Sequence, residues 1–240
     1  MEDEVAKHTK KIYRAWKSPQ HSVADKIKEI LIEIFIIVFA VTISIWFHNW
    51  SDHRHEQNEV KEFLKGLKDD LSEDIKQLTL NKNVTIRLDS GYRFLYSIPK
   101  NSKEYDGAND TLIYHKLYFD LHVTRPAIGR YEGFKSSGKI GNIENDSLKQ
   151  HILAFYEQTI PHLIYGENFV NGIQTKMLDL QIDKSEQTSI KDFVTSSKLK
   201  ALLNLTTQNF DGNINGRDGY NYAIGQANWI IKEIDKELEK

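Results

Sequence analysis

The chain has 240 residues and a formal net charge of −2, so it has neither the basic surface of a nucleic-acid-binding protein nor an acidic tail for a basic partner. It has no cysteine, which excludes disulfides, thiolate metal sites and a cysteine nucleophile. Its 4 prolines and 13 glycines are few for the many turns of an all-β protein. We expect a mainly helical protein with no nucleic-acid partner.

Residues 1–29 are predicted to be a basic cytoplasmic tail. They carry seven lysines and arginines, whereas residues 51–70 carry four. Because segments on the cytoplasmic side are richer in these residues, the bias places the N-terminus inside the cell. The stretch from Val5 to Trp16 is either a short helix on the inner membrane surface or a disordered tail.

Residues 30–50 are predicted to be a transmembrane helix. They read ILIEIFIIVFAVTISIWFHNW, and Glu33 is the only acidic or basic residue before His48. A spanning helix needs about 20 mostly apolar residues. Trp46 and Trp50 stand at the C-terminal end, where aromatic rings favour the membrane–water boundary. A buried core helix is the alternative, whereas a cleaved signal peptide is disfavoured because no small-residue cleavage site follows.

Glu33 stands about one turn inside this span. An ionisable side chain in hydrocarbon costs several kcal/mol and often marks a functional site. Glu33 either pairs with Lys26, Lys28 or a second subunit, or lies at the level of the headgroups and is solvated.

His48, Asp52 and His55 fall at i, i+4 and i+7, on one face of a helix that continues beyond the span. Imidazole and carboxylate ligands at this spacing could hold a zinc ion. A polar turn next to the membrane is the simpler interpretation, so we expect no metal site and no cofactor.

Residues 51–80 are predicted to be a stem helix at the start of an ectodomain that covers residues 51–240. No proline interrupts the stem, and apolar residues recur in it at steps of four and three. This stripe includes Val60, Leu64, Leu67 and Leu71. It is either the core face of one subunit or a coiled coil that would make the chain a homo-oligomer.

The rest of the ectodomain shows helical periodicity and no alternating strand pattern of any length. We predict helices at about 83–96, 111–121, 127–137 and 146–180 and another that begins near 197, with loops at 100–110 and 209–219. The fold class is therefore all-α, with one N-terminal transmembrane helix that continues into a helical-bundle ectodomain.

Several residues are expected to set the ends of these helices. Gly138 suits a left-handed helix end, and Pro161 should kink the helix that contains it. N-caps are expected at Asn145 or Asp146 and at Thr195 or Ser196. A final stripe predicts a C-terminal helix antiparallel to the stem, with Asp218 or Asn221 as its N-cap. The residues of this stripe are Ile224, Ala227, Ile231, Ile234 and Leu238.

Two polar groups have only superficial catalytic or binding features. The turn Lys135–Lys139 lacks the first glycine of a phosphate-binding loop and is followed by Ile140, so a structural turn anchored by Tyr131 and Glu132 explains it better. A second group, in one helical region, could do acid–base chemistry, but no nucleophile accompanies it. That group is His151, His162, Tyr165 and Glu167.

Two stretches resemble a known family. The first, Glu33 to Ile75, has a Glu at the start of the span, Asn-Trp at its exit and then a charged helix. The second, Arg130 to Glu157, has a Tyr-Glu…Lys-Ser-Ser-Gly turn followed by a helix. Together they resemble the 6090 family of domains of unknown function, small membrane proteins of Bacteroidota. His48 departs from the small polar residue usual there. The resemblance implies a lineage and a topology but no activity.

These features favour a non-catalytic protein anchored in the bacterial inner membrane by a single span, with the ectodomain in the periplasm. We expect an accessory or scaffold subunit of an envelope complex, whose partners are the lipid bilayer and either further copies of the chain or other membrane proteins. The alternative is a sensor-type ectodomain that binds a ligand and signals through a membrane partner.

Overall fold

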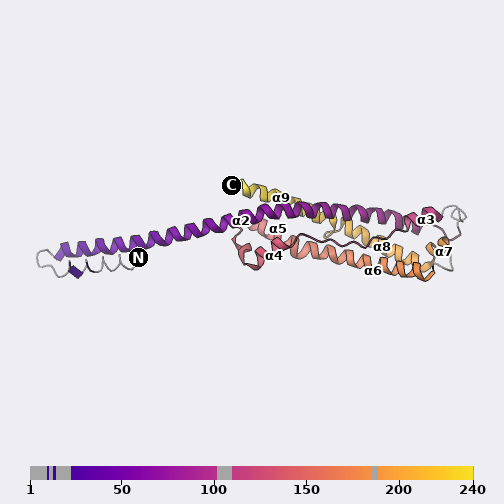
Figure 1. Cartoon of the computed structure of the whole chain (residues 1–240), viewed down its shortest axis with the longest axis horizontal. Helices are drawn as coiled ribbons and strands as arrows, with labels where there is room; N and C mark the ends of the chain where they lie inside the picture. Colours follow the sequence, from indigo (N-terminus) through magenta and orange to yellow (C-terminus); the bar gives the residue numbers. More distant parts are fainter. Residues whose placement is uncertain (1–9, 11–12, 15–22, 102–109, 185–188, 240) are drawn as a thin grey trace. The chain divides into compact units, whose positions relative to one another are not determined.

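A computed structural model describes the chain except for residues 1–9, 11–12, 15–22, 102–109, 185–188 and 240. It divides into two compact units, Met1–Glu59 and Val60–Lys240. The described residues form helices and no strands (Figure 1), as predicted for an all-α protein. Most of the predicted tail 1–29 and of the predicted loop 100–110 lies outside the described residues.

Helix α2 (Val23–Ser97) is the longest element, with 75 residues. The predicted stem is part of it, but the separate helix predicted at 83–96 is wrong, because α2 continues without a break to Ser97. No residue between 80 and 97 is a proline, so nothing in the backbone chemistry stops the helix earlier. Ile98 and Pro99 follow, and a residue before proline disfavours the helical conformation.

Lys200 caps the C-terminal end of α2 from another helix. Its Nζ donates to the carbonyl oxygens of Leu95 at 2.9 Å and Ile98 at 2.8 Å, and also to that of Tyr96. The last carbonyls of a helix have no partner within the helix and carry partial negative charge. The half-buried ammonium of Lys200 therefore satisfies three of them at once.

Helix α3 (Asp110–Lys116) is shorter than predicted, and the predicted helix 111–121 is wrong beyond Lys116. Residues 117–128 instead run as an extended segment between the helices of the bundle. This segment does not pair with a neighbouring strand, so most of its backbone N–H and C=O groups need hydrogen-bond partners from side chains. Those partners come from helices far away in the sequence and are described below.

The region after this segment largely follows the predictions. Helix α4 (Gly129–Ser136) is followed by Gly138, which has a φ of 77°, in the left-handed region that favours glycine. After a short 3-10 turn, η1 (Lys139–Asn142), helix α5 (Asp146–Ala154) begins. Asn145 is its N-cap, since its side chain accepts from the Leu148 amide at 3.1 Å.

A π-helical turn, η2 (Phe155–Thr159), joins α5 to helix α6 (Ile160–Lys184). Pro161 stands at the second position of α6, and proline has no amide hydrogen to close the usual i→i−4 bond. The predicted irregularity at Pro161 therefore takes the form of a widened turn just before it.

Helix α7 (Ile190–Val194) was not predicted, whereas helix α8 (Ser197–Asn215) begins where expected. Ser196 caps α8 by accepting from the Leu199 amide at 3.4 Å. The predicted loop 209–219 is wrong up to Asn215, because α8 continues to that residue and buries Phe210 on the way, and only residues 216–219 form a loop. The packing of this ring outweighs the low helix propensity of the glycine and asparagines around it.

Helix α9 (Tyr220–Leu238) ends the chain. Its N-cap is Gly219, so the predicted caps Asp218 and Asn221 are wrong. Lys68 of α2 pairs with Asp235 at 2.5 Å, and Lys82 further along α2 donates to Asn221 at 3.4 Å. The two helices are therefore antiparallel from Val60 onward, as predicted.

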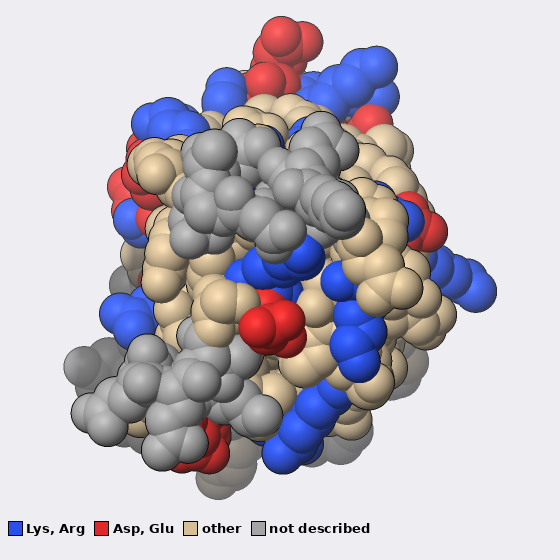
Figure 2. All heavy atoms as spheres, turned by 90° about the vertical axis from the view of Figure 1, so that its right-hand side faces the viewer, with Lys and Arg blue, Asp and Glu red and all other residues tan. Residues whose placement is uncertain are grey.

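The Val60–Lys240 unit has two adjoining hydrophobic clusters. One joins the first turns of this part of α2 to α4, α5, the π turn and α9, and the other joins the end of α2 to α3, α6, α7 and α8. Figure 2 views the molecule from the end where α3 and α7 lie, and there Lys and Arg side chains are spread among uncharged ones. Apolar side chains thus fill most of the inside, and most charged groups remain at the surface, with Asp74 and Glu167 as buried exceptions.

Candidate functional site

The most unusual surface of the described chain is the apolar part of α2 within the Met1–Glu59 unit. From Ile27 to Trp50 most large apolar side chains are exposed, among them Phe35 at 66% and Trp46 at 61%, and from residue 38 onward they are exposed on every side of the helix. The best 18-residue window has a mean hydropathy of 2.7 and is 6% buried. By length and composition, this is one helix among the described residues that can cross a membrane.

The polar side chains inside this stretch are satisfied within the helix. Thr42 donates to the carbonyl oxygen of Val38 at 2.8 Å, and Ser44 donates to that of Ala40 at 2.9 Å. In hydrocarbon an unpaired polar group would cost several kcal/mol. These hydroxyls therefore do not oppose insertion into a bilayer.

Glu33 differs from its neighbours in this stretch. It is 8% exposed, and it is the one buried side chain among the described residues between Ile27 and Trp50. Leu31, Ile32 and Ile34 around it are exposed. The Glu33 side chain is thus shielded from solvent, whereas its apolar neighbours are exposed. In a soluble protein the charged side chain would be exposed and the apolar ones buried.

The candidate metal ligands do not converge. His48 Nε2 lies 3.4 Å from Asp52 Oδ2, whereas His55 Nε2 lies 3.7 Å from Glu59. Both histidine side chains are more than three-quarters exposed. No group of three potential ligands occurs among the described residues, so His48, Asp52 and His55 form part of two surface pairs.

The stem stripe lies inside the bundle of a single chain. Val60, Leu64, Leu67 and Leu71 are 5%, 2%, 0% and 0% exposed and belong to one hydrophobic cluster with α9 and α5. A coiled coil between two copies through this stripe would have to uncover that cluster. Its residues therefore act as the core face of one subunit and are not available as an interface.

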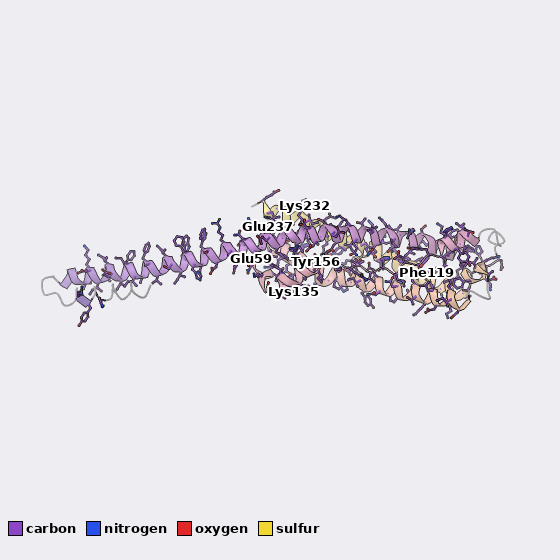
Figure 3. The ribbon with its side chains drawn as sticks, viewed as in Figure 1. Glu59, Phe119, Lys135, Tyr156, Lys232 and Glu237 are labelled. Carbon is purple, nitrogen blue, oxygen red and sulfur yellow. The ribbon has the colours of Figure 1, made fainter. Side chains whose placement is uncertain are left out.

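The Tyr-Glu…Lys-Ser-Ser-Gly stretch holds α4 against the bundle. Tyr131 is buried, stacks on Tyr156 with ring centres 4.5 Å apart and donates to Glu157 Oε1 at 2.6 Å. Lys135 forms an ion pair with the same carboxylate. Figure 3 shows Tyr156 within the bundle and Lys135 at its edge. Phe134 stacks on Phe63 of α2 at 3.9 Å, so the motif has a structural role.

The second polar group predicted from sequence is not brought together. His151 stacks on Trp229 at 3.8 Å, and His162 lies 3.9 Å from the carboxylate of Asp218. Tyr165 is 74% exposed, whereas Glu167 is 2% exposed. Only Glu167 belongs to a buried polar network, and its partners there were not predicted.

This network fixes the extended segment 117–128. Glu167 Oε2 accepts from the Thr124 amide at 2.6 Å, and its Oε1 accepts from the Thr124 hydroxyl at 2.7 Å and from Tyr220 at 2.6 Å. Gln174 accepts from the Asp120 amide at 3.1 Å and donates to the Asp120 carbonyl at 3.2 Å. Side chains thus replace the neighbouring strand that an extended segment needs.

His122 completes the network at the other side of Tyr220. Its Nε2 lies 3.1 Å from the Tyr220 hydroxyl, and its Nδ1 lies 3.2 Å from Asp120 Oδ1. Tyr220 donates its own hydrogen to Glu167, so its hydroxyl links the His122 ring to the Glu167 carboxylate. Burial and the Glu167 carboxylate raise the pKa of Tyr220, so this hydroxyl keeps its proton.

Asp74 holds the last part of the same segment. Its Oδ1 accepts from the Ala127 amide at 2.9 Å, while its Oδ2 and the nearby Tyr156 hydroxyl are buried without a hydrogen-bond partner among the described residues. Burial raises the pKa of Asp74 to about 6, although the Ala127 amide works in the opposite direction. The charged form of this carboxyl is therefore unfavourable in the folded state.

The sequence contains no local signal for this network. Thr124, His122 and Tyr220 are ordinary polar residues at unrelated spacings, and only the fold brings them to Glu167. Chemically, the network can hold and orient protons, but its carboxylates and hydroxyls are occupied by the segment that they fix. We call this network the clamp on the extended segment.

Comparison with known proteins identifies one relationship. No curated protein and no solved structure matches the chain. The model of a protein family, described as a family of unknown function (DUF6090), matches residues 33–181. This match begins at Glu33, includes the Tyr-Glu…Lys-Ser-Ser-Gly stretch and ends in α6. Because it covers more than half of the chain, the protein belongs to the DUF6090 family.

Proposed function

We propose that this protein is a non-catalytic accessory or scaffold subunit of a bacterial envelope complex, anchored in the inner membrane by the apolar part of α2. The observation that carries the proposal is the exposure of most large apolar side chains between Ile27 and Trp50, on every side of the helix from residue 38 onward. Monomeric soluble proteins rarely expose contiguous apolar patches larger than a few hundred Å². A lipid bilayer removes this cost because its interior is apolar around the whole helix.

Lysine and arginine counts support an orientation with the N-terminus in the cytoplasm. Residues 1–29 carry seven such residues, against four in residues 51–70. In this topology the Val60–Lys240 unit lies in the periplasm. The resemblance of the span and its flanks to proteins of Bacteroidota suggests a source in that lineage.

A structural role is supported by the way the second unit uses its polar groups. Glu167, Tyr220 and His122 bind one another and the extended segment, which leaves them engaged in holding the fold. An ectodomain of this kind presents a fixed surface close to a membrane, as a scaffold subunit must.

The absence of cysteine allows a direct test of topology. Single cysteines are introduced by Ser137→Cys, at an exposed position after α4, and by Ser18→Cys in the tail. A membrane-impermeant maleimide added to intact spheroplasts should label Ser137→Cys and should label Ser18→Cys only after lysis. The opposite pattern would reverse the topology, and labelling of both in intact spheroplasts would refute the anchor.

The scaffold role is tested by extraction of the native membrane in a mild detergent and mass determination of the intact particle. A defined multimer or a partner in fixed stoichiometry is the expected result. A lone monomer with a constant mass in several detergents would contradict the scaffold role and leave the anchor intact. In that case, the ligand-binding alternative becomes the better explanation of the ectodomain.

A further inference from the structure

A small groove lies between α2 and the end of α3. It has a volume of about 230 Å³. Its walls are Arg87, Leu88, Gly91, His115, Lys116 and Tyr118. A Cβ atom at Gly91 would lie 2.9 Å from the Lys116 carbonyl oxygen, closer than real contacts allow. The absence of a side chain at Gly91 therefore lets the end of α3 approach α2 and form the groove.

Arg87 is held in place by an aromatic ring. Its guanidinium carbon lies 4.6 Å from the centre of the Tyr118 ring, and the Tyr118 hydroxyl donates to Asp120 Oδ2 at 2.9 Å. Asp120 is itself engaged by His122 through Oδ1. A cation over the face of an aromatic ring is attracted by the ring, so this contact restrains the Arg87 guanidinium in the lining of the groove.

The lining of the groove has a strong excess of basic groups. Arg87, His115 and Lys116 come from two helices, and no acidic residue lines the groove. Among the described residues, no ion pair joins a carboxylate to any of these three side chains. Elsewhere on α2, basic groups do have acidic partners, such as Arg93 with Asp89 at 2.8 Å. The cationic side chains of Arg87 and Lys116 thus line the groove together, and no acidic residue lines it among the described residues, which favours an anion.

We propose that this groove binds a phosphate group, supplied either by a free phosphorylated anion or by an anionic headgroup. Arginine matches phosphate oxygens with two parallel hydrogen bonds, and lysine adds a point charge. The groove is smaller than the roughly 300–1,000 Å³ typical of pockets for drug-sized ligands, so it suits a phosphate group and not a large organic molecule. This site is independent of the membrane anchor and of the scaffold role.

The test uses the full chain in dodecyl maltoside, a detergent without phosphate, and equilibrium dialysis against radiolabelled inorganic phosphate at constant ionic strength. Binding should be saturable, and Arg87→Gln and Lys116→Gln should each weaken it by about tenfold or more. Lys82→Gln is the matched control, because Lys82 is on α2 like Arg87 and is a half-buried lysine like Lys116, but contacts Asn221 outside the groove. Binding should not change in this variant.

Two further measurements identify the source of the phosphate group and guard against misfolding. Phosphatidylglycerol added to the micelles is compared with glycerol phosphate as a competitor, and the stronger competitor identifies a headgroup or a free anion. Circular dichroism melts establish that each variant folds, and Arg87→Lys should retain part of the binding. The proposal is overturned if the native chain does not bind phosphate in the millimolar range, or if folded Lys116→Gln binds it as well as the native chain.

Discussion

Two stretches of α2 bury or expose their apolar side chains in opposite ways. Between Ile27 and Trp50, adjacent positions such as Ile34, Phe35 and Ile36 are all exposed. Between Val60 and Leu78, apolar residues recur at steps of three and four and are buried. A helix that is apolar all around needs an apolar solvent on all sides, whereas a stripe needs one packed neighbour. The angular distribution of apolar residues, together with their larger share in the first stretch, separates the two environments.

The largest effect should come from the buried stripe. Leu67→Ala removes a fully buried side chain and should lower the free energy of unfolding by about 2–5 kcal/mol. Ile45→Ala, at a position that is 57% exposed in the apolar stretch, is the matched control and should leave the unfolding of the bundle unchanged. Chemical denaturation of the full chain in detergent, followed by circular dichroism, measures both. Equal losses would remove the distinction between the two stretches.

In the apolar stretch between Ile27 and Trp50, a charged substitution should weaken membrane insertion. Phe39→Arg places a cation near the middle of the span and should cost about 3 kcal/mol of membrane insertion. The fraction of the chain that remains in membranes after carbonate extraction should fall, whereas Phe39→Leu should behave as the native chain. If Phe39→Arg stays fully in the membrane fraction, this stretch is not the anchor.

A buried carboxyl group in the bundle should give a stability that depends on pH. The pKa of Asp74 is about 6 in the folded state against 3.8 for a free aspartate, so the folded state binds the proton more tightly. Stability contributed by this group is therefore highest at low pH and is lost as the pH rises through 6. Asp74→Asn should be more stable than the native chain at pH 8, by up to about 3 kcal/mol.

The control for this prediction is the same comparison at pH 5, where the native carboxyl is mostly protonated. There the advantage of Asp74→Asn should fall to about half, because an aspartate with a pKa of 3.8 in the unfolded chain is still mostly ionised at this pH. Carboxylates with a lowered pKa, such as Asp146 and Glu157, affect both proteins equally and cancel in the difference. A difference in stability that stays constant from pH 5 to pH 8 would show that burial does not penalise the charge of Asp74.

Glu167→Gln probes the clamp on the extended segment. Glutamine cannot accept from the Thr124 amide, the Thr124 hydroxyl and Tyr220 together without an unsatisfied donor, so we expect a loss of about 1–3 kcal/mol. Amide hydrogen exchange at Thr124 should become faster. Glu132→Gln, at an exposed site on α4, should change neither quantity.

The smallest effect should come from the ion pair between Lys68 and Asp235. Both side chains are more than one-third exposed, and such pairs contribute about 0.2–1 kcal/mol. A double-mutant cycle with Lys68→Met and Asp235→Asn measures the coupling directly. A coupling energy well above this range would mean that an exposed ion pair stabilises the packing of α2 about as much as a buried apolar side chain does.

The helices and several of their ends could be predicted because their signals are local. Asn145 and Ser196 are N-caps whose side chains accept from an amide only three residues later. Gly138 ends a helix because glycine itself favours a positive φ. The stripe from Val60 to Leu71 repeats within one helix. Each of these signals can be recognised in a short window of sequence.

The predictions that are wrong concern segments whose structure depends on contacts with residues far away in the sequence. Residues 117–121 were predicted to be helical, but Gln174 of α6 and Tyr92 of α2 hold this backbone extended. Residues 209–215 were predicted to be a loop, but burial of Phe210 keeps them helical. In the candidate site, the sequence pattern marks Glu167 as a candidate but gives no reason to select its partners Thr124 and Tyr220. These outcomes depend on residues dozens of positions away.

The extended segment also has a consequence for the order of folding. Its amides at Asp120, Thr124 and Ala127 donate to side chains of α6 and α2. These hydrogen bonds cannot all form until the two helices have come together. Loop closure over such separations is slow compared with helix formation. We therefore expect the helices to assemble first and this segment to become ordered last, as the step that completes the native state.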